Sequence, residues 1–159
     1  MSHRRVVITG MGAVSPLGCD IETIWKRLLA GQSGIRVLPE EIVETLSVKI
    51  GGQVQTKEQD PESGFDPDQF VVPKDQKKMD RFILFAMAAA EMAITNAGWK
   101  AETAEQQERT ATVIGSGIGG FPAIAHAVRT NDSRGAKRLS PFTIPSFLVN
   151  LAAGQVSIK

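Results

Sequence analysis

The segment that most constrains the fold is an apolar run broken by glycines near the N-terminus, residues 5–18. Residues 6–8 are apolar and β-branched without alternation, which is typical of a strand covered on both faces in a parallel sheet. Glycines end this run, and apolar residues at helical spacing follow Asp20, a good N-cap, up to Gly31. The sequence therefore predicts a strand–loop–helix unit over residues 4–31.

Further strands and helices are predicted to alternate along the chain. We expect a long helix over 75–97, a strand over 110–117, a helix over 123–128, a polar basic loop over 129–138 and an apolar helix over 145–159. Such alternation predicts an α/β fold with a mainly parallel or mixed sheet and covering helices. The last apolar segment has no stop signal, so we expect the chain to be the front of a larger protein.

Residues 32–74 show weaker helix and strand patterns than the rest of the chain. A short helix is expected over 39–46 and a weak strand over 47–55, and a polar stretch with turn signals follows over 56–69. We interpret residues 32–74 as a surface excursion within one incomplete domain that spans residues 1–159.

The composition is that of an ordinary soluble globular protein. Eighteen basic and seventeen acidic residues leave a net charge of +1, which gives no general reason to expect a nucleic acid or an anionic membrane as partner. No apolar run approaches the ~20 residues of a membrane span. A single cysteine excludes a disulfide framework and favours a reducing, cytoplasmic location.

A second glycine-rich segment, Gly115-x-Gly117-x-x-Gly120, follows a predicted strand and precedes a predicted helix. This spacing matches the dinucleotide fingerprint, in which backbone amides and a helix N-terminus hold a pyrophosphate. No acidic strand end follows about 20 residues later to bind a ribose. We therefore predict no cofactor, and keep a nucleotide-binding module only as a disfavoured alternative.

The reactive side chains of the chain give no catalytic centre. Cys19 precedes a predicted helix, where a thiolate is stabilised, but neither His3 nor His126 has a sequence context that would pair with it. A structural role is the better interpretation of Cys19. Two histidines alone do not supply a metal site of the usual ligand number, so no metal site is predicted.

Two basic clusters are more informative. Lys74, Lys77 and Lys78 come near the start of the long predicted helix, where the helix dipole disfavours cations. A second cluster consists of Arg134, Lys137 and Arg138. Solvated surface is the simplest interpretation of both clusters, and an anionic partner is the alternative.

Six segments in collinear order resemble the β-ketoacyl-acyl-carrier-protein synthases, of the synthase II type. They are distributed over essentially the whole chain: Val6–Gly18, Gly31–Ile35, Lys78–Phe82, Ile114–Gly120, Ser140–Pro145 and Asn150–Ile158. The resemblance implies the N-terminal part of a thiolase-like fold, in which two similar α/β halves stack in layers, usually as a homodimer. It also implies that this chain corresponds to less than half of a full-length member of the family.

The resemblance further implies an acyltransferase of fatty-acid synthesis. In this family a cysteine takes an acyl group from its carrier protein, and two histidines help malonyl-carrier protein lose CO₂ and attack the acyl-enzyme thioester. The family's cysteine follows the segment that ends at Lys159, and both histidines lie in the second half. No catalytic residue is therefore carried over, and the chain alone is expected to be inactive.

Other family positions are carried over by the resemblance. Gly117 and Ile118 match the turn that lines the acyl-chain tunnel, and Phe142 and Thr143 match the segment that closes the partner subunit's tunnel. Residues Lys74, Lys77, Lys78, Lys137 and Arg138 match basic positions that receive the acidic acyl carrier protein, acyl- or malonyl-loaded.

One alternative of another class stays open at this point. Chain-length factors of polyketide systems share this fold but lack the nucleophile and are not catalytic. Nothing before Lys159 separates them from the synthases.

Overall fold

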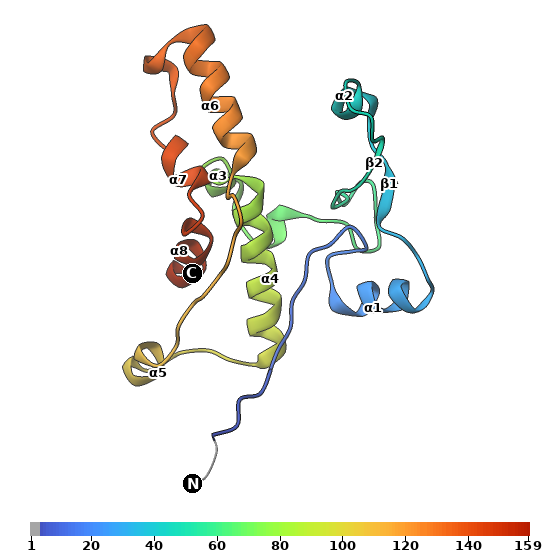
Figure 1. The fold of residues 1–159 in the computed structure, drawn as a ribbon. Helices are drawn as coiled ribbons and strands as arrows, with labels where there is room; N and C mark the ends of the chain where they lie inside the picture. The colour runs from blue at the N-terminus through green and yellow to red at the C-terminus, as the bar shows by residue number, and fades with distance from the viewer. Residues whose placement is uncertain (1–3) are drawn as a thin grey trace.

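The computed structural model describes residues 4–159, and its central element is the helix α4, Arg81–Ala97 (Figure 1). The helices α7 and α8 lie on one side of α4 in this view, and α1 with the strand pair lies on the other. In chain order the elements are α1 (Ile21–Leu29), β1 (Ile35–Val37), α2 (Glu40–Val43), β2 (Ile50–Gly52), the 3₁₀ turn η1 (Pro67–Gln69), α3 (Pro73–Gln76), α4, α5 (Ala104–Glu108), α6 (Phe121–Arg134), the 3₁₀ turn η2 (Ala136–Arg138), α7 (Thr143–Phe147) and α8 (Leu151–Ile158).

The long helix predicted over 75–97 is confirmed for most of its length, but it begins in two pieces. The short helix α3 ends at Gln76, and α4 starts only after Asp80, whose backbone is extended (φ −73°, ψ 160°). The Asp80 side chain accepts a hydrogen bond from the backbone N–H of Phe82, so this residue begins a new helix. At the other end Gly98 adopts φ +59°, the left-handed conformation that ends helices.

The core lies where α4 packs against α8. Ile83 and Ala152 are fully buried there, and Met87 and Val71 complete the buried cluster. Small residues on both helices allow this close approach, because the methyl side chain of alanine is small enough for the two backbones to come near each other. Val71 belongs to residues 32–74, so part of that segment contributes to the core in addition to its exposed surface.

The first predicted helix is confirmed as α1. The Asp20 carboxylate accepts a hydrogen bond of 2.7 Å from the N–H of Thr23, and Gly31 has φ +67°. The glycines before it serve packing: a methyl group at Gly10 or Gly12 would collide with backbone atoms of α4. Their segment therefore lies directly along α4, as Figure 1 shows for the blue N-terminal trace.

The predicted parallel sheet is not formed within residues 4–159. Their one sheet is the antiparallel pair β1–β2, in which Ile35 lies opposite Gly52. Residues 6–8 and 110–117 form no strand, and Val6 is 92% exposed. A strand needs a neighbour to accept and donate its backbone hydrogen bonds, and the part of the chain described here gives these two segments none.

Two helical predictions near the C-terminus need correction. The helix predicted over 123–128 extends to Arg134, because no glycine interrupts it before Gly135, so the polar loop begins later than expected. The apolar helix predicted over 145–159 is broken into α7 and α8 at Leu148, which is extended (ψ 133°). Among the described helices, none is both long and apolar enough to cross a membrane.

Candidate functional site

The first basic cluster lies at the junction between α3 and α4. Lys78 forms an ion pair of 2.6 Å with Asp75, and its Nζ lies 5.3 Å from the centre of the Phe142 ring. The hydrogen bond from Lys78 lowers the pKa of the Asp75 carboxyl below its usual range. Lys78 therefore connects the start of α4 to the segment before α7, through charge on one side and an aromatic face on the other.

The second basic cluster begins at the end of α6 and continues into η2. Gly135 adopts φ +81° and ends α6, and η2 then carries Lys137 and Arg138. Within residues 4–159, neither of these two side chains lies within 4.0 Å of a carboxylate, and the same holds for Lys74 and Lys77. Four of the five predicted docking cations thus form no ion pair with a described carboxylate.

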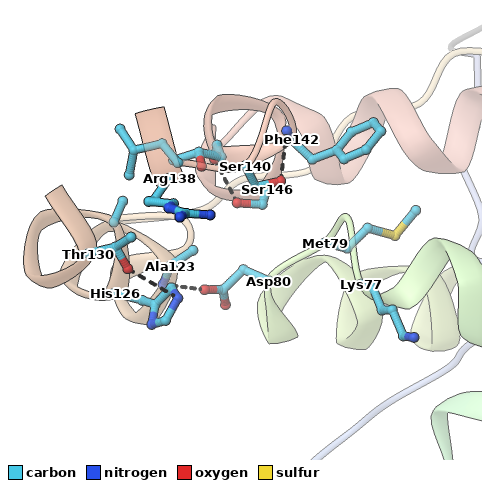
Figure 2. Close-up of a pocket in the computed structure, with 13 residues that line it drawn as sticks. Lys77, Met79, Asp80, Ala123, His126, Thr130, Arg138, Ser140, Phe142 and Ser146 are labelled. Carbon is cyan, nitrogen blue, oxygen red and sulfur yellow. Dashed lines mark hydrogen bonds between the residues drawn. The ribbon is translucent and has the colours of Figure 1, made fainter. Parts of the chain in front are cut away.

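The two basic clusters meet at one pocket of about 370 Å³ (Figure 2). Lys77, which follows α3, and Arg138, at the end of η2, both line it. Phe142 and Thr143, predicted for a different role, also line it. The remaining lining residues come from the start of α4, from α6 and from the segment 139–146: Met79, Asp80, Ala123, His126, Ala127, Thr130, Leu139, Ser140 and Ser146.

Asp80 holds the walls of this basic pocket together. Its Oδ2 accepts a hydrogen bond of 2.9 Å from the N–H of Ala123, and its own N–H donates to the carbonyl of Ser146 at 3.1 Å. One residue therefore contacts three helices: α4, α6 and α7. Figure 2 shows the carboxylate facing Ala123 across the gap between α4 and α6.

The glycine-rich loop leads into α6 beside this pocket. Gly117 and Ile118 lie on its exposed part, with Ile118 69% exposed. Gly119 and Gly120 lie against α7 instead, and the N–H of Gly120 donates to the carbonyl of Phe147 at 3.0 Å. The Ile118 side chain is therefore largely exposed within residues 4–159.

The fingerprint in this loop is a poor nucleotide site. The Ala123 N–H at the start of α6 already donates to the Asp80 carboxylate, so a negative charge from the chain itself occupies the place of a phosphate. Pro122 removes a further donor from this helix end. The two glycines nearest the helix serve close packing against α7.

Cys19 and His126 are not brought together. The Cys19 N–H donates to Ser63 Oγ at 2.8 Å near α1, and burial raises the pKa of its thiol, which opposes a nucleophilic role. His126 is exposed on α6, where its Nε2 lies 3.5 Å from Thr130 Oγ1. His3 lies outside the described residues. Within the described chain, no three His, Cys, Asp or Glu residues form a metal-binding group.

Sequence reasoning missed Asp80 and the place of His126 in the basic pocket. The signal for Asp80 was present, since an aspartate directly before a helix is a preferred N-cap. Its second partner, Ala123, lies 43 residues away, and no local pattern indicates that contact.

Comparison with known proteins identifies the family. Residues 3–159 match the family described as Beta-ketoacyl synthase, N-terminal domain. The 3-oxoacyl-[acyl-carrier-protein] synthase 2 of Rhizobium meliloti (strain 1021) is 50% identical over 156 residues, which are 98% of this chain and 37% of the relative. The chain thus spans little more than a third of the length of this relative.

Solved structures agree with the match. A β-ketoacyl synthase from Burkholderia phymatum STM815 superimposes with a TM-score of 0.76 at 26% identity, over 98% of this chain and 36% of that one. A type II PKS acyl-carrier protein in complex with its ketosynthase gives 0.73 at 22% identity, over 99% and 40%. This architecture is the thiolase-like fold of the ketosynthases, and the chain belongs to the β-ketoacyl synthase family, whose N-terminal domain it matches.

Proposed function

We propose that this chain is the N-terminal part of a cytoplasmic 3-oxoacyl-[acyl-carrier-protein] synthase of the synthase II type, working as a homodimer. The 50% identity to a curated synthase 2 over nearly the whole chain supports the activity. The reaction joins malonyl-carrier protein, with loss of CO₂, to an acyl group held as a thioester on the enzyme. The catalytic cysteine and two histidines of this reaction are supplied by residues outside this chain, since Cys19 and His126 lie on separate elements and do not come together.

The observation that carries the proposal is the meeting of the two basic clusters at one pocket. Lys77 and Arg138 line it together, and neither has a carboxylate within 4.0 Å among the described residues. Cations that line one pocket without ion pairs create a positive potential that attracts an anionic partner. An acidic acyl carrier protein supplies that charge, so this pocket and its rim, with Lys74, Lys78 and Lys137, form the carrier-docking surface.

The acyl chain is assigned to the loop beside the docking surface. Ile118 and Gly117 form one wall of the tunnel, and the rest of the wall comes from chain beyond this sequence and from the second subunit. Phe142 and Thr143 extend toward that subunit. Ile144 and Val149, both partly exposed, provide apolar surface close to this contact.

The exposed apolar segments belong to a mainly parallel sheet in the complete protein. Val6–Ile8 and residues 110–114 flank α4 and have no strand partner among residues 4–159. Pairing with strands outside the chain would satisfy their backbone groups and cover their side chains. This assignment completes the layered fold of the family.

Charge reversal tests the docking surface in the full-length protein. We expect Lys77→Glu together with Arg138→Glu to raise the KM for acyl-carrier protein by about 10–100-fold, because each reversal converts an attraction into a repulsion of about 1 kcal/mol or more. Activity with a small acyl-pantetheine thioester, which has no acidic protein surface, should stay within about twofold. The matched control is Lys100→Glu, an exposed lysine on the loop before α5. Equal losses with both substrates would refute the docking role.

A second measurement separates the synthase from the non-catalytic alternative. The full-length protein should take up one acyl group per subunit from acyl-carrier protein, whereas residues 1–159 alone should take up none. A full-length protein that folds, binds carrier and forms no acyl-enzyme would be a chain-length factor instead.

A further inference from the structure

Two helix N-termini converge on the side chain of Asp80. Its Oδ1 accepts from the N–H of Phe82 at 3.4 Å at the start of α4, and its Oδ2 accepts from Ala123 at 2.9 Å at the start of α6. Each α-helix leaves its first N–H groups without partners inside the helix. A single carboxylate therefore satisfies donors of two helices that are far apart in the sequence.

The helix α6 has no cap of its own. Its N-cap residue is Gly120, which has no side chain, and Pro122 has no N–H. The Asp80 carboxylate does for α6 what an N-cap aspartate normally does within its own helix. The absence of a side chain at Gly120 makes this contact possible, since a Cβ there would lie 2.8 Å from the Cβ of Asp80 and 2.8 Å from the Cα of Phe147.

The charge of Asp80 is balanced by helix ends. No Lys, Arg or His of residues 4–159 lies within 4.0 Å of its carboxylate. The positive ends of the α4 and α6 dipoles stabilise a negative charge at this place. The N–H of Asp80 also donates to Ser146 in α7, so the residue joins three helices at one point.

We propose that Asp80 is a positioning residue that fixes the glycine-rich loop 115–120 relative to α4. The docking cation Lys77 lies three residues before Asp80, and Ile118 lies two residues before Gly120, the residue packed on Asp80. Asp80 therefore holds both the glycine-rich loop and the adjacent part of the docking surface in place. The consequence for acyl-chain selection rests on the function proposed above, but the control of loop order does not.

The test uses the full-length protein with two substitutions at this position. Asp80→Ala removes both accepted hydrogen bonds, and Asp80→Asn keeps one acceptor oxygen without the charge. The matched control is Asp66→Ala, since Asp66 caps η1 in the same way, accepting from the N–H of Asp68 at 3.0 Å, and within residues 4–159 it forms no hydrogen bond with α6 or α7. Amide hydrogen exchange over residues 115–124 is measured beside kcat/KM for a short and a long acyl-carrier substrate.

We expect Asp80→Ala to accelerate exchange over 119–124 about tenfold or more, the effect of losing a hydrogen bond to a charged group. The long acyl substrate should lose about tenfold more kcat/KM than the short one. Asp80→Asn should fall between Asp80→Ala and wild type, and Asp66→Ala should change neither readout.

Unchanged exchange over 119–124 in Asp80→Ala would overturn the positioning role. Equal losses of kcat/KM for both substrates in both Asp80 variants would show that Asp80 contributes only to the general stability of the protein. A wild-type protein that is inactive with every acyl-carrier substrate would instead defeat the proposed function, and the exchange measurement would still decide the role of Asp80.

Discussion

Replacing Arg27 by methionine should destabilise the protein in a pH-dependent way. The Arg27 guanidinium bridges α1 to the loop before Phe65, with Nη1 2.5 Å from Asp60 Oδ2 and Nη2 3.0 Å from Asp60 Oδ1. Nη1 also donates to the carbonyl of Leu17 at 2.8 Å. The two charged side chains are only 12% and 13% exposed, so this bidentate pair is better shielded than an ordinary surface ion pair.

The magnitude follows from Asp60. The hydrogen bonds from Arg27 are the main reason that the pKa of the Asp60 carboxyl falls from its ordinary 3.8 to about 2. One pKa unit corresponds to about 1.4 kcal/mol, so the shift is worth about 2 kcal/mol, and solvent screening lowers this to about 1–2 kcal/mol. Because the folded-state pKa is depressed, this stability is complete above about pH 4 and is lost as the pH falls through about 2.

The assay is urea unfolding of wild type and Arg27→Met, followed by circular dichroism at pH 7 and at about pH 2. The variant should lose about 1–2 kcal/mol in unfolding free energy at pH 7, and the difference should shrink at the acidic pH. Lys26→Met is the control, because Lys26 is 73% exposed and pairs only with the exposed Glu62. A difference between wild type and Arg27→Met that is the same at both pH values would refute the reasoning.

Four other outcomes are expected. Ile118→Phe in the full-length protein should lower kcat/KM for long acyl chains by roughly 5- to 150-fold, the equivalent of about 1–3 kcal/mol of overpacking, and leave short ones nearly unchanged. Gly119→Ala should lower stability by about 1–3 kcal/mol in thermal unfolding, because Gly119 has φ +81° and a methyl group would meet the Phe147 carbonyl, whereas Gly115→Ala, in open space, should change it by less than about 0.5 kcal/mol. Cys19 should react with iodoacetamide at pH 7 more slowly in the folded than in the urea-unfolded protein, because burial raises its pKa. The isolated chain should self-associate in light scattering, since its apolar segments are uncovered; a clean monomer would contradict this.

Local signals were sufficient for the ends of several helices. Asp20 and Gly31 bracket α1, and Gly98 ends α4, because capping depends on side chains within a few residues. The helix α5 was missed although its signal is present: Thr103 and Gln106 form a capping box.

Non-local contacts set the limit of prediction. The apolar residues 6–8 and 110–117 have strand composition, but strand formation depends on a neighbouring strand, and the described residues supply none. The convergence of Lys77 and Arg138 could be suspected only from the family resemblance, since 60 residues separate them. The double contact of Asp80 depends on the packing of α6 against α4. The spacing of apolar residues along the sequence does not predict this packing.

The N-terminal glycines that pack against α4 are synthesised well before α4 itself. The N–H of Met11, between Gly10 and Gly12, donates to Asn96 Oδ1 at 3.0 Å, a partner translated 85 residues later. At about 5–20 residues per second, the ribosome needs roughly 4–17 s to make that intervening chain. During this interval Gly10 and Gly12 have no α4 to pack against, so the N-terminal segment reaches its folded position only after α4 has been made.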